Sequence, residues 1–287
     1  MGSLSQPPFT RIAIVGVGLI GGSIALAVKR RWPAVEIAGI DRQSVLDTAR
    51  VLCVVDRGAE TLEAAADAEL VVLAAPVLQN AVALQELPRH VAHAVVTDVG
   101  STKRSILEAA RALPPRLPFV GGHPLAGAAA GGVEAARPDL FVDRPWLLTR
   151  SASTTDTALN SLTEFVGGLK AVPRMIDAVE HDRLLAYLSH LPQLAVTAMM
   201  HVVGDHAGAE GLALAGRGLH DTTRLASSPA PPWRDIVASN GDNIEVAIDA
   251  LIAALEDLKS ATRPEGIVCL EQMFRSAARW KGVLEHS

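Results

Sequence analysis

The sequence predicts an α/β fold with a doubly wound, mostly parallel sheet, followed by an all-helical domain. In the first half of the 287 residues, short apolar runs alternate with helical patterns, as in parallel strands joined by crossover helices. These runs are apolar nearly throughout, so both faces of the sheet are expected to be covered. From about Met175 the pattern is helical only. We therefore expect a first domain at residues 1–174 and a second at 175–287.

The elements of the first domain follow from these runs. The first strand is expected at residues 11–15 and the helix after it at 19–30. Further strands are expected at 35–40, 70–75, 94–97 and 119–121, and more peripheral ones at 146–149 and 170–172.

The second domain is expected to consist of long helices. The first covers residues 180–203 and is kinked near Pro192, because a proline ring removes one backbone hydrogen bond. Two more helical stretches are expected at 243–263 and 265–285. The Pro/Ser-rich segment 226–233 is expected to be irregular.

Composition narrows the class of protein. With 49% hydrophobic and 20% charged residues, the chain can bury a sizeable core. A net charge of −5 gives no reason to expect a nucleic-acid or anionic-membrane partner. Two cysteines, Cys53 and Cys269, cannot build a disulfide framework. Residues 1–10 hold no apolar signal region, and no apolar run reaches the roughly 18 residues of a membrane span. We expect a soluble cytoplasmic protein.

A glycine-rich motif, GVGLIG at residues 16–21, comes directly after the first predicted strand and opens a helix. Glycines at these positions permit a tight turn, so that a pyrophosphate can lie at the helix N-terminus. Asp41, about 20 positions later, completes the Rossmann-type fingerprint. The residues expected to bind the dinucleotide are Gly16, Gly18, Leu19, Ile20, Gly21, Asp41 and Arg42.

Cofactor choice depends on the end of the second strand. The Asp41 carboxylate would accept hydrogen bonds from the adenosine ribose and repel a 2′-phosphate, which favours NAD. Arg42 could contact a 2′-phosphate, so NADP use is left open.

Two loops of the first domain hold candidate chemical groups. In GGHPLAG at 121–127, His123 is either a proton acceptor near the nicotinamide or a structural loop histidine. In DVGSTK at 98–103, Ser101 either caps the next helix or points its hydroxyl into the site. Lys103 is expected to be solvated.

The second domain holds three more polar features. In SHLPQ at 189–193, His190 alone would be taken as a partly buried helical histidine. His181 and Asp182 lie near the start of the long helix and are expected to be cap-region polar residues, to which no role is assigned. Arg224 could clamp a carboxylate bidentately or form a surface ion pair.

Taken together, these motifs resemble the prephenate/arogenate (cyclohexadienyl) dehydrogenase family. The resemblance covers essentially the whole chain, and the glycine loop is its least specific part. The ordered series is GVGLIGGS at 16–23, DVGSTK at 98–103, GGHPLAG at 121–127, SHLPQ at 189–193 and DTTRLASSPAPPWRDI at 221–236.

The resemblance implies oxidative decarboxylation of prephenate to 4-hydroxyphenylpyruvate, or of arogenate to tyrosine, with hydride transfer to NAD(P). His123 would accept the proton of the ring 4-hydroxyl as hydride leaves C4, and Ser101 would orient both groups. Arg224 would bind a substrate carboxylate, His190 would contact the substrate side chain, and Trp233 would help to bind the substrate. A homodimer through the helical domain is implied, and no metal.

The chain departs from the family pattern at residues 128–130, which are all alanine where many prephenate enzymes carry polar or acidic side chains. This leaves the choice between prephenate and arogenate open. We expect no appended regulatory domain and no fused mutase.

Three alternatives remain at this point. One is a 4-amino-4-deoxyprephenate dehydrogenase of the same family. Another is a β-hydroxyacid dehydrogenase, which is expected to place a lysine on the long helix, whereas this chain has no lysine between Lys170 and Lys259. The third is a non-catalytic NAD-sensing regulator, which the lack of a basic patch disfavours.

Overall fold

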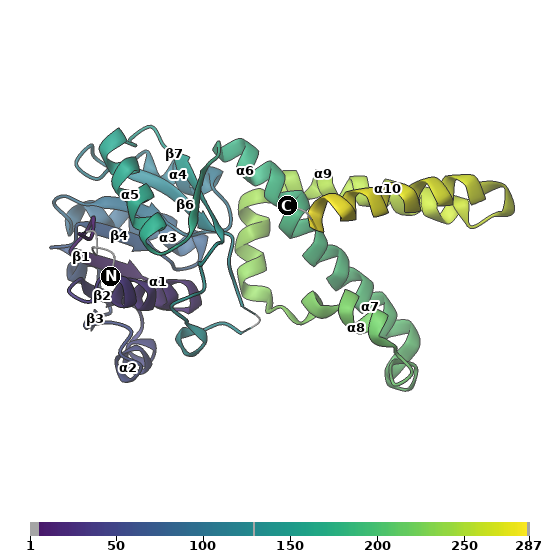
Figure 1. Ribbon diagram of the computed structural model, residues 1–287, viewed down its shortest axis with the longest axis horizontal. Helices are drawn as coiled ribbons and strands as arrows, with labels where there is room; N and C mark the ends of the chain where they lie inside the picture. Colours follow the sequence, from purple (N-terminus) through teal and green to yellow (C-terminus); the bar gives the residue numbers. More distant parts are fainter. Residues whose placement is uncertain (1–5, 129, 286–287) are drawn as a thin grey trace. The chain divides into compact units, whose positions relative to one another are not determined.

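The computed structural model describes residues 6–128 and 130–285, which form two compact units (Figure 1). The first unit comprises residues up to 185 together with 227–240, and the second comprises 186–226 and the residues from 241 onward. The predicted boundary between residues 174 and 175 stays a prediction.

The first unit is built on one eight-stranded sheet in the order β3-β2-β1-β4-β5-β6-β7-β8. Strands β1 to β6 are parallel, β7 is antiparallel to β6, and β8 is parallel to β7. This confirms the predicted doubly wound, mostly parallel sheet. The strands are β1 (Arg11–Val15), β2 (Glu36–Ile40), β3 (Arg57–Ala59), β4 (Leu70–Leu73), β5 (Val95–Asp98), β6 (Phe119–Pro124), β7 (Pro145–Arg150) and β8 (Val172–Met175).

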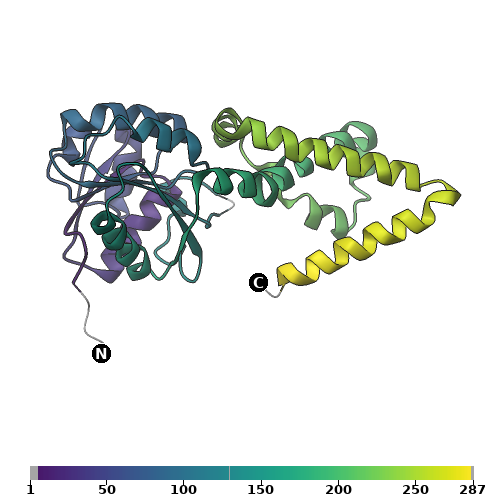
Figure 2. The ribbon, with the colours of Figure 1, turned by 90° about the horizontal axis from the view of Figure 1, so that it is seen from above.

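Helices cover both faces of this sheet (Figure 2). Side chains alternate along a strand, so Ile12 and Ile14 of β1 pack into one core cluster while Ala13 packs into another. The first cluster also contains residues of α1 and α5, and the second contains residues of α3 and α4. The helices of this unit are α1 (Leu19–Arg31), α2 (Gln43–Val51), α3 (Val77–Glu86), α4 (Arg104–Ala110), α5 (Asp156–Gly168), α6 (Ala178–Leu185) and the first part of α9 (Ala230–Ala261).

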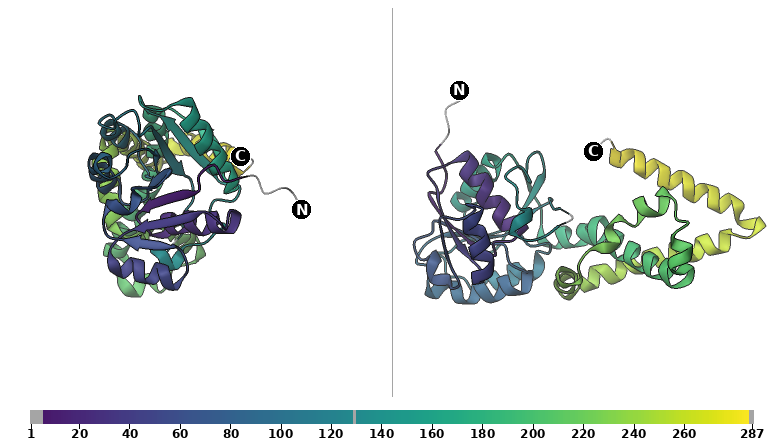
Figure 3. Two further views of the ribbon diagram at one scale, coloured as in Figure 1. Left: turned by 90° about the vertical axis from the view of Figure 1, so that its left-hand side faces the viewer. Right: turned by 90° about the horizontal axis from the view of Figure 1, so that it is seen from below.

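The second unit is helical, as predicted (Figure 3). It contains a π-helical segment η4 (Ala186–His190), α7 (Leu191–Leu212), α8 (Arg217–Thr222), the second part of α9, and α10 (Ile267–Glu285). Short 3₁₀ turns complete the chain: η1 (Leu62–Ala65), η2 (Leu87–Arg89), η3 (Val133–Ala135), η5 (Arg224–Ser227) and η6 (Pro264–Gly266).

Several local predictions were wrong. Strand β3 was not predicted, and β6 continues to Pro124, so that His123 lies in a strand rather than a loop. The helix predicted at 180–203 does not simply kink at Pro192. A π-helical segment, η4, precedes the proline, which lies in the first turn of α7. The segment expected to be irregular at 226–233 is helical from Ala230, because prolines are tolerated in a first turn, where the N–H groups have no intrahelical acceptor. Helix α9 therefore begins well before residue 243 and bends at Asn240.

The strand order places the candidate site. The chain runs from β1 to β2 and β3 on one side, and then returns to β4 on the other side of β1. In such sheets the ligand crevice lies beyond the carboxyl ends of the strands, at the point where the order reverses. The loops after β1, β4 and β5, together with the end of β6, share that edge.

Candidate active site

The glycine loop after β1 has the shape that the fingerprint requires. Gly16 has φ +94°, and a Cβ atom there would lie 2.5 Å from the backbone nitrogen of Ala75. A Cβ at Gly21 would lie 2.0 Å from the Gly16 carbonyl oxygen. By contrast, nothing lies within 4 Å of a Cβ at Gly18, the N-cap of α1, and no side chain caps this helix. The first N–H groups of α1 are therefore not capped by a side chain, and the open space beside them fits a pyrophosphate.

Asp41 joins the end of β2 to this loop. Its Oδ2 accepts a hydrogen bond from the backbone nitrogen of Val17 at 2.8 Å, and its Oδ1 accepts one from the nitrogen of Arg42 at 2.7 Å. The Asp41 side chain is 19% exposed and that of Arg42 is 83% exposed. The structure thus brings Asp41 beside the glycine loop, where the cofactor role predicted for it and its neighbours remains a prediction.

A buried ion pair fixes the loop after β5. Lys103 Nζ donates to Asp98 Oδ2, and both side chains are fully buried. Asp98 also accepts hydrogen bonds from the nitrogen of Gly100 at 2.8 Å and of Gly122 in β6 at 3.1 Å. The expectation of a solvated Lys103 was therefore wrong, because the lysine neutralises a carboxylate that ties this loop to β6.

Ser101 is not a helix cap. The N-cap of α4 is Lys103, two residues later, and no side chain caps this helix. Ser101 is partly exposed in the loop between β5 and α4. The alternative, a hydroxyl that points into the site, stays a prediction.

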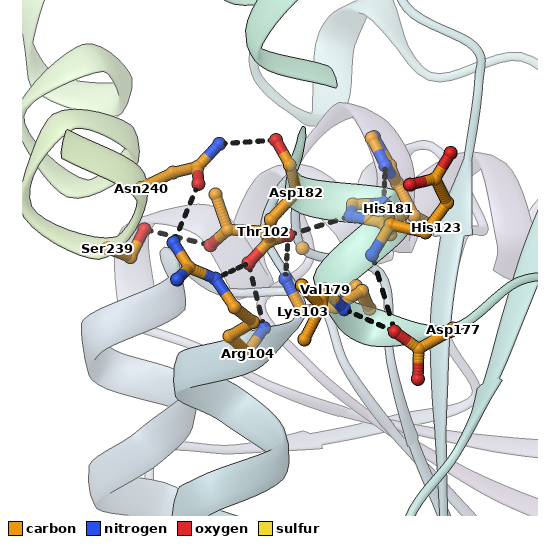
Figure 4. Close-up of polar contacts among 12 residues, drawn as sticks. Thr102, Lys103, Arg104, His123, Asp177, Val179, His181, Asp182, Ser239 and Asn240 are labelled. Carbon is orange, nitrogen blue, oxygen red and sulfur yellow. Dashed lines mark hydrogen bonds and ion pairs between the residues drawn. The ribbon is translucent and has the colours of Figure 1, made fainter. Parts of the chain in front are cut away.

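His123 is hydrogen-bonded to a second histidine. Its Nδ1 lies 2.9 Å from Nε2 of His181, whose Nδ1 lies 2.8 Å from Oδ1 of Asp182 (Figure 4). His181 and Asp182 are fully buried, whereas His123 is partly exposed. The expectation that His181 and Asp182 are cap-region residues was wrong, because both side chains belong to this buried series.

Asp182 is held from three sides. Its carboxylate accepts hydrogen bonds from the nitrogens of Lys103 (2.7 Å) and Arg104 (2.9 Å), and from Nε of Arg104 (3.2 Å). Asn240 Nδ2 donates to the Asp182 carbonyl at 2.8 Å, and Arg104 Nη2 donates to Asn240 Oδ1 at 3.0 Å (Figure 4). The start of α4 thus contacts the carboxylate of Asp182 in α6, and the first part of α9 contacts its backbone carbonyl.

The charges follow from these contacts. Burial lowers the pKa of His181, and the nearby Lys103 cation adds to this effect against the opposing pull of Asp182. Burial alone would raise the pKa of Asp182, but the hydrogen bonds from His181, Arg104 and Lys103 outweigh it and lower the pKa. At neutral pH, Asp182 is therefore an anion and His181 a neutral imidazole.

The roles of His181 and Asp182 were missed in the sequence, although their helical spacing indicates a buried pair. Leu185 is buried, and His181 lies four residues before it and Asp182 three. Residues three and four apart share one face of a helix, so both lie on the buried face of α6. A buried histidine next to a buried aspartate needs polar partners, which marks this pair as a candidate network.

The remaining predicted residues are divided between the two units. Ser101, His123 and Trp233 belong to the first unit, and His190 and Arg224 to the second. His190 is buried at the end of η4, Arg224 is exposed in η5, and Trp233 is partly exposed in α9. Their grouping around one substrate stays a prediction.

The all-alanine departure is only partly visible. Ala128 and Ala130 are exposed, and Ala129 lies outside the described residues. Within residues 6–128 and 130–285 there is no cluster of three or more metal-ligating side chains. None of the helices described is long and apolar enough to cross a membrane.

A glycine loop after β1 at the strand-order reversal, with a histidine near the end of β6 in the same sheet, is typical of a dinucleotide-dependent dehydrogenase. Comparison with known families narrows this class. The prephenate dehydrogenase nucleotide-binding domain matches residues 24–175, and the prephenate dehydrogenase dimerization domain matches residues 177–275. The chain belongs to the prephenate dehydrogenase family, and its membership confirms the resemblance found in the motifs.

Individual relatives agree with this assignment. The prephenate dehydrogenase of Bacillus subtilis is 33% identical over 277 residues, which are 94% of this chain and 75% of that protein. The crystal structure of prephenate dehydrogenase from A. aeolicus, in complex with hydroxyphenyl propionate and NAD+, is 28% identical with a TM-score of 0.85 and covers 96% of this chain and 99% of its own. Synechocystis arogenate dehydrogenase is 27% identical with a TM-score of 0.76 and covers 94% and 99%.

Proposed function

We propose that this chain catalyses the oxidative decarboxylation of prephenate or arogenate in tyrosine biosynthesis, with hydride transfer to NAD or NADP. One observation carries the proposal: His123 lies at the end of β6, backed by His181 and Asp182, on the sheet edge that also holds the glycine loop. The similarity to both a prephenate and an arogenate dehydrogenase supports it.

The reaction requires little beyond positioning, a base and charge recognition, because forming an aromatic ring makes it strongly favourable. The C4–H bond of the substrate breaks with its electron pair, and the hydride passes to the nicotinamide. The 4-hydroxyl proton passes to His123. The bond from the ring to its carboxylate then breaks, CO₂ leaves, and the electron pair completes the aromatic ring. The resulting phenolate oxygen takes up a proton.

Each predicted residue has a part in this scheme. His123 accepts the hydroxyl proton, and Ser101 orients the hydroxyl and the imidazole. Arg224 binds a substrate carboxylate through a charge-assisted hydrogen bond. His190 and Trp233 contact the substrate away from the reacting carbon.

The cofactor site fits a dinucleotide. The open space at Gly18 leaves room for a pyrophosphate, and the Asp41 carboxylate beside the loop can accept hydrogen bonds from the ribose hydroxyls. NAD bound there supplies the hydride acceptor. The exposed guanidinium of Arg42 leaves NADP as a second possibility.

A cytoplasmic homodimer is part of the proposal. The second unit holds an apolar groove of about 670 Å³ between α7 and α9. Helix α10 buries none of its described residues, and it exposes large apolar side chains such as Phe274 (68% exposed) and Trp280 (61%). Exposed apolar surface of this kind is typical of an interface, and the match to a dimerization domain supports a second copy of the chain as the partner.

The test compares NADH or NADPH formation with prephenate and with arogenate, each with NAD and with NADP. We expect rapid turnover with at least one substrate and a higher kcat/KM with NAD. A protein that binds NAD but oxidises neither substrate would contradict the proposal.

A further inference from the structure

We propose that His181 is a positioning residue that, anchored by Asp182, holds the His123 proton on Nδ1 and so makes Nε2 of His123 the atom that accepts the substrate proton. The inference rests on the proposed function and deepens it. It follows from the order in which donors and acceptors must alternate along the three side chains.

The order begins at Asp182. An ionised carboxylate can only accept hydrogen bonds. Oδ1 of Asp182 already accepts from the nitrogen of Lys103, and Oδ2 accepts from two nitrogens of Arg104. The atom of His181 that faces Oδ1 at 2.8 Å is Nδ1. This nitrogen must therefore carry a proton.

The next step passes through His181. A neutral imidazole has one N–H and one lone pair. Burial keeps His181 neutral, since it lowers the pKa of this imidazole. With its proton on Nδ1, His181 presents a lone pair at Nε2, and the atom 2.9 Å away is Nδ1 of His123. Two lone pairs do not form a hydrogen bond, so Nδ1 of His123 must be the donor.

The consequence falls on the other nitrogen of His123. In neutral His123 the single proton is on Nδ1, and the lone pair is on Nε2. When Nε2 takes the proton of the substrate hydroxyl, Nδ1 keeps its bond to His181, which then stabilises the new imidazolium. The proton can return from Nε2 to the phenolate oxygen after CO₂ has left, so the step balances within the reaction proposed above.

The charges around His181 agree with this direction. Asp182 on its own helix and Asp98 at the end of β5 favour a positive charge, and Lys103 before α4 opposes one. His123 faces it from β6. A proton gained by His123 thus lies next to a neutral imidazole whose far side contacts a carboxylate.

The direct test is nitrogen NMR of the full-length protein with labelled histidine, without substrate. The chain has nine histidines, and the spectrum of His123→Asn identifies the signals of His123. We expect a neutral His123 protonated on Nδ1, which is not the tautomer that histidine prefers in water. A neutral His123 protonated on Nε2 would overturn the inference, and this measurement needs no activity and no variant of His181.

Two variants of His181 add a kinetic readout. His181→Phe keeps a ring of similar size but no acceptor, so we expect the His123 proton to move to Nε2. We expect kcat to fall roughly 10- to 100-fold, the effect of losing a hydrogen bond to a charged group. KM and NAD affinity should change less than about twofold. His181→Gln places an amide oxygen near the former Nε2, and it should restore both the tautomer and most of kcat.

The outcomes separate the inference from the proposed function. If His123 shows the Nδ1 tautomer but the protein oxidises neither substrate, the proposed function fails and the tautomer stands. If the protein is active and His181→Phe and His181→Gln lose kcat equally with no change in the tautomer, His181 is only structural.

Discussion

The two units of the chain differ in what they bury. The first unit encloses four charged or titratable side chains, Asp98, Lys103, His181 and Asp182, and it pairs each of them within the same chain. The second unit leaves much of its apolar surface uncovered, in the groove between α7 and α9 and along α10. The first unit pairs these four side chains internally, whereas the second unit leaves large apolar side chains exposed to solvent.

The difference indicates that the first unit serves the chemistry and the second serves association with another chain. A buried, fully paired polar network holds side chains in fixed orientations, as a reacting centre requires. Exposed apolar faces are stabilised by association. Substitutions in this polar network and beside the glycine loop should therefore change chemistry and cofactor binding, and substitutions in the groove should change assembly.

The largest effect is expected from His123→Asn. Asparagine can still form a hydrogen bond with the substrate hydroxyl, but it cannot accept the proton. We predict a fall in kcat of roughly 10²- to 10⁴-fold, with NAD affinity unchanged in calorimetric titration. A variant with nearly wild-type kcat would remove His123 from the mechanism.

The groove should respond to a buried charge. Ile252 lines the groove and is 48% exposed in the single chain. We expect Ile252→Glu to weaken the dimer at least about 10²-fold, because an unpaired buried charge is strongly destabilising. Light scattering at several concentrations would measure this. The control is Val82→Glu, at an apolar position on α3 that is 61% exposed, which should leave the mass unchanged. Equal dissociation in both variants, or in neither, would count against the groove as the interface.

Carboxylate recognition by Arg224 gives a smaller expected effect. Arg224→Ala should mainly raise KM, because the guanidinium binds a charge present in both the ground state and the transition state. Loss of such a hydrogen bond corresponds to roughly 10- to 150-fold. Arg217→Ala, also exposed in the second unit, is the matched control. An unchanged KM in Arg224→Ala would assign the carboxylate to another group.

Cofactor preference should shift in Asp41→Asn. The amide keeps an acceptor for the nitrogen of Val17 and so preserves the glycine loop, but it removes the charge that repels a 2′-phosphate. We expect the ratio of kcat/KM for NADP to that for NAD to rise by roughly fivefold, in line with about 1 kcal/mol between two solvated charges. Asp47→Asn, an exposed carboxylate on α2, should leave the ratio unchanged. A wild-type enzyme that already prefers NADP would contradict this account of Asp41.

The smallest expected effect is on how the free energy of unfolding depends on pH. The pKa of His181 is lower in the folded chain than the value of about 6.5 expected when it is unfolded. The unfolded state therefore binds the proton more readily, and stability falls as the pH drops below about 6.5. This effect has a limit of about 1.4 kcal/mol per pH unit. Urea unfolding between about pH 5 and pH 8 should show a shallower acid decline in His181→Gln. An identical decline in both proteins would show that other groups cause it.

The sequence predicted the parts of the fold that depend on neighbouring residues. Strand β1, the glycine loop and α1 were predicted almost to the residue, because the apolar run, the GVGLIG motif and the helical pattern follow one another directly in the sequence. Strand β3 was missed, since three half-buried residues around a glycine carry no clear strand pattern. The π-helical segment before Pro192 was also not predicted. A proline in the sequence indicates that the helix is irregular nearby, but it does not show which turn of the helix changes its hydrogen bonding.

The candidate site was predicted only in part, for a similar reason. His123 stood out through its motif, whereas its partner His181 comes from a helix 58 residues further along the chain. The pairing of Lys103 with Asp98 depends on how the loop after β5 folds against β6. Contacts of this kind arise from tertiary packing, so spacing in the sequence does not reveal them.

The central claim is that oxidation and loss of the ring carboxylate occur in one reaction of this chain. The most direct measurement uses prephenate and arogenate with an isotopic label in the ring carboxylate, and follows labelled CO₂ and reduced cofactor in the same sample. The account predicts equal amounts of labelled CO₂ and reduced cofactor with at least one of the two substrates, and it predicts that His123→Asn forms both products roughly 10²- to 10⁴-fold more slowly. Reduced cofactor without labelled CO₂, or labelled CO₂ without reduced cofactor, would contradict it.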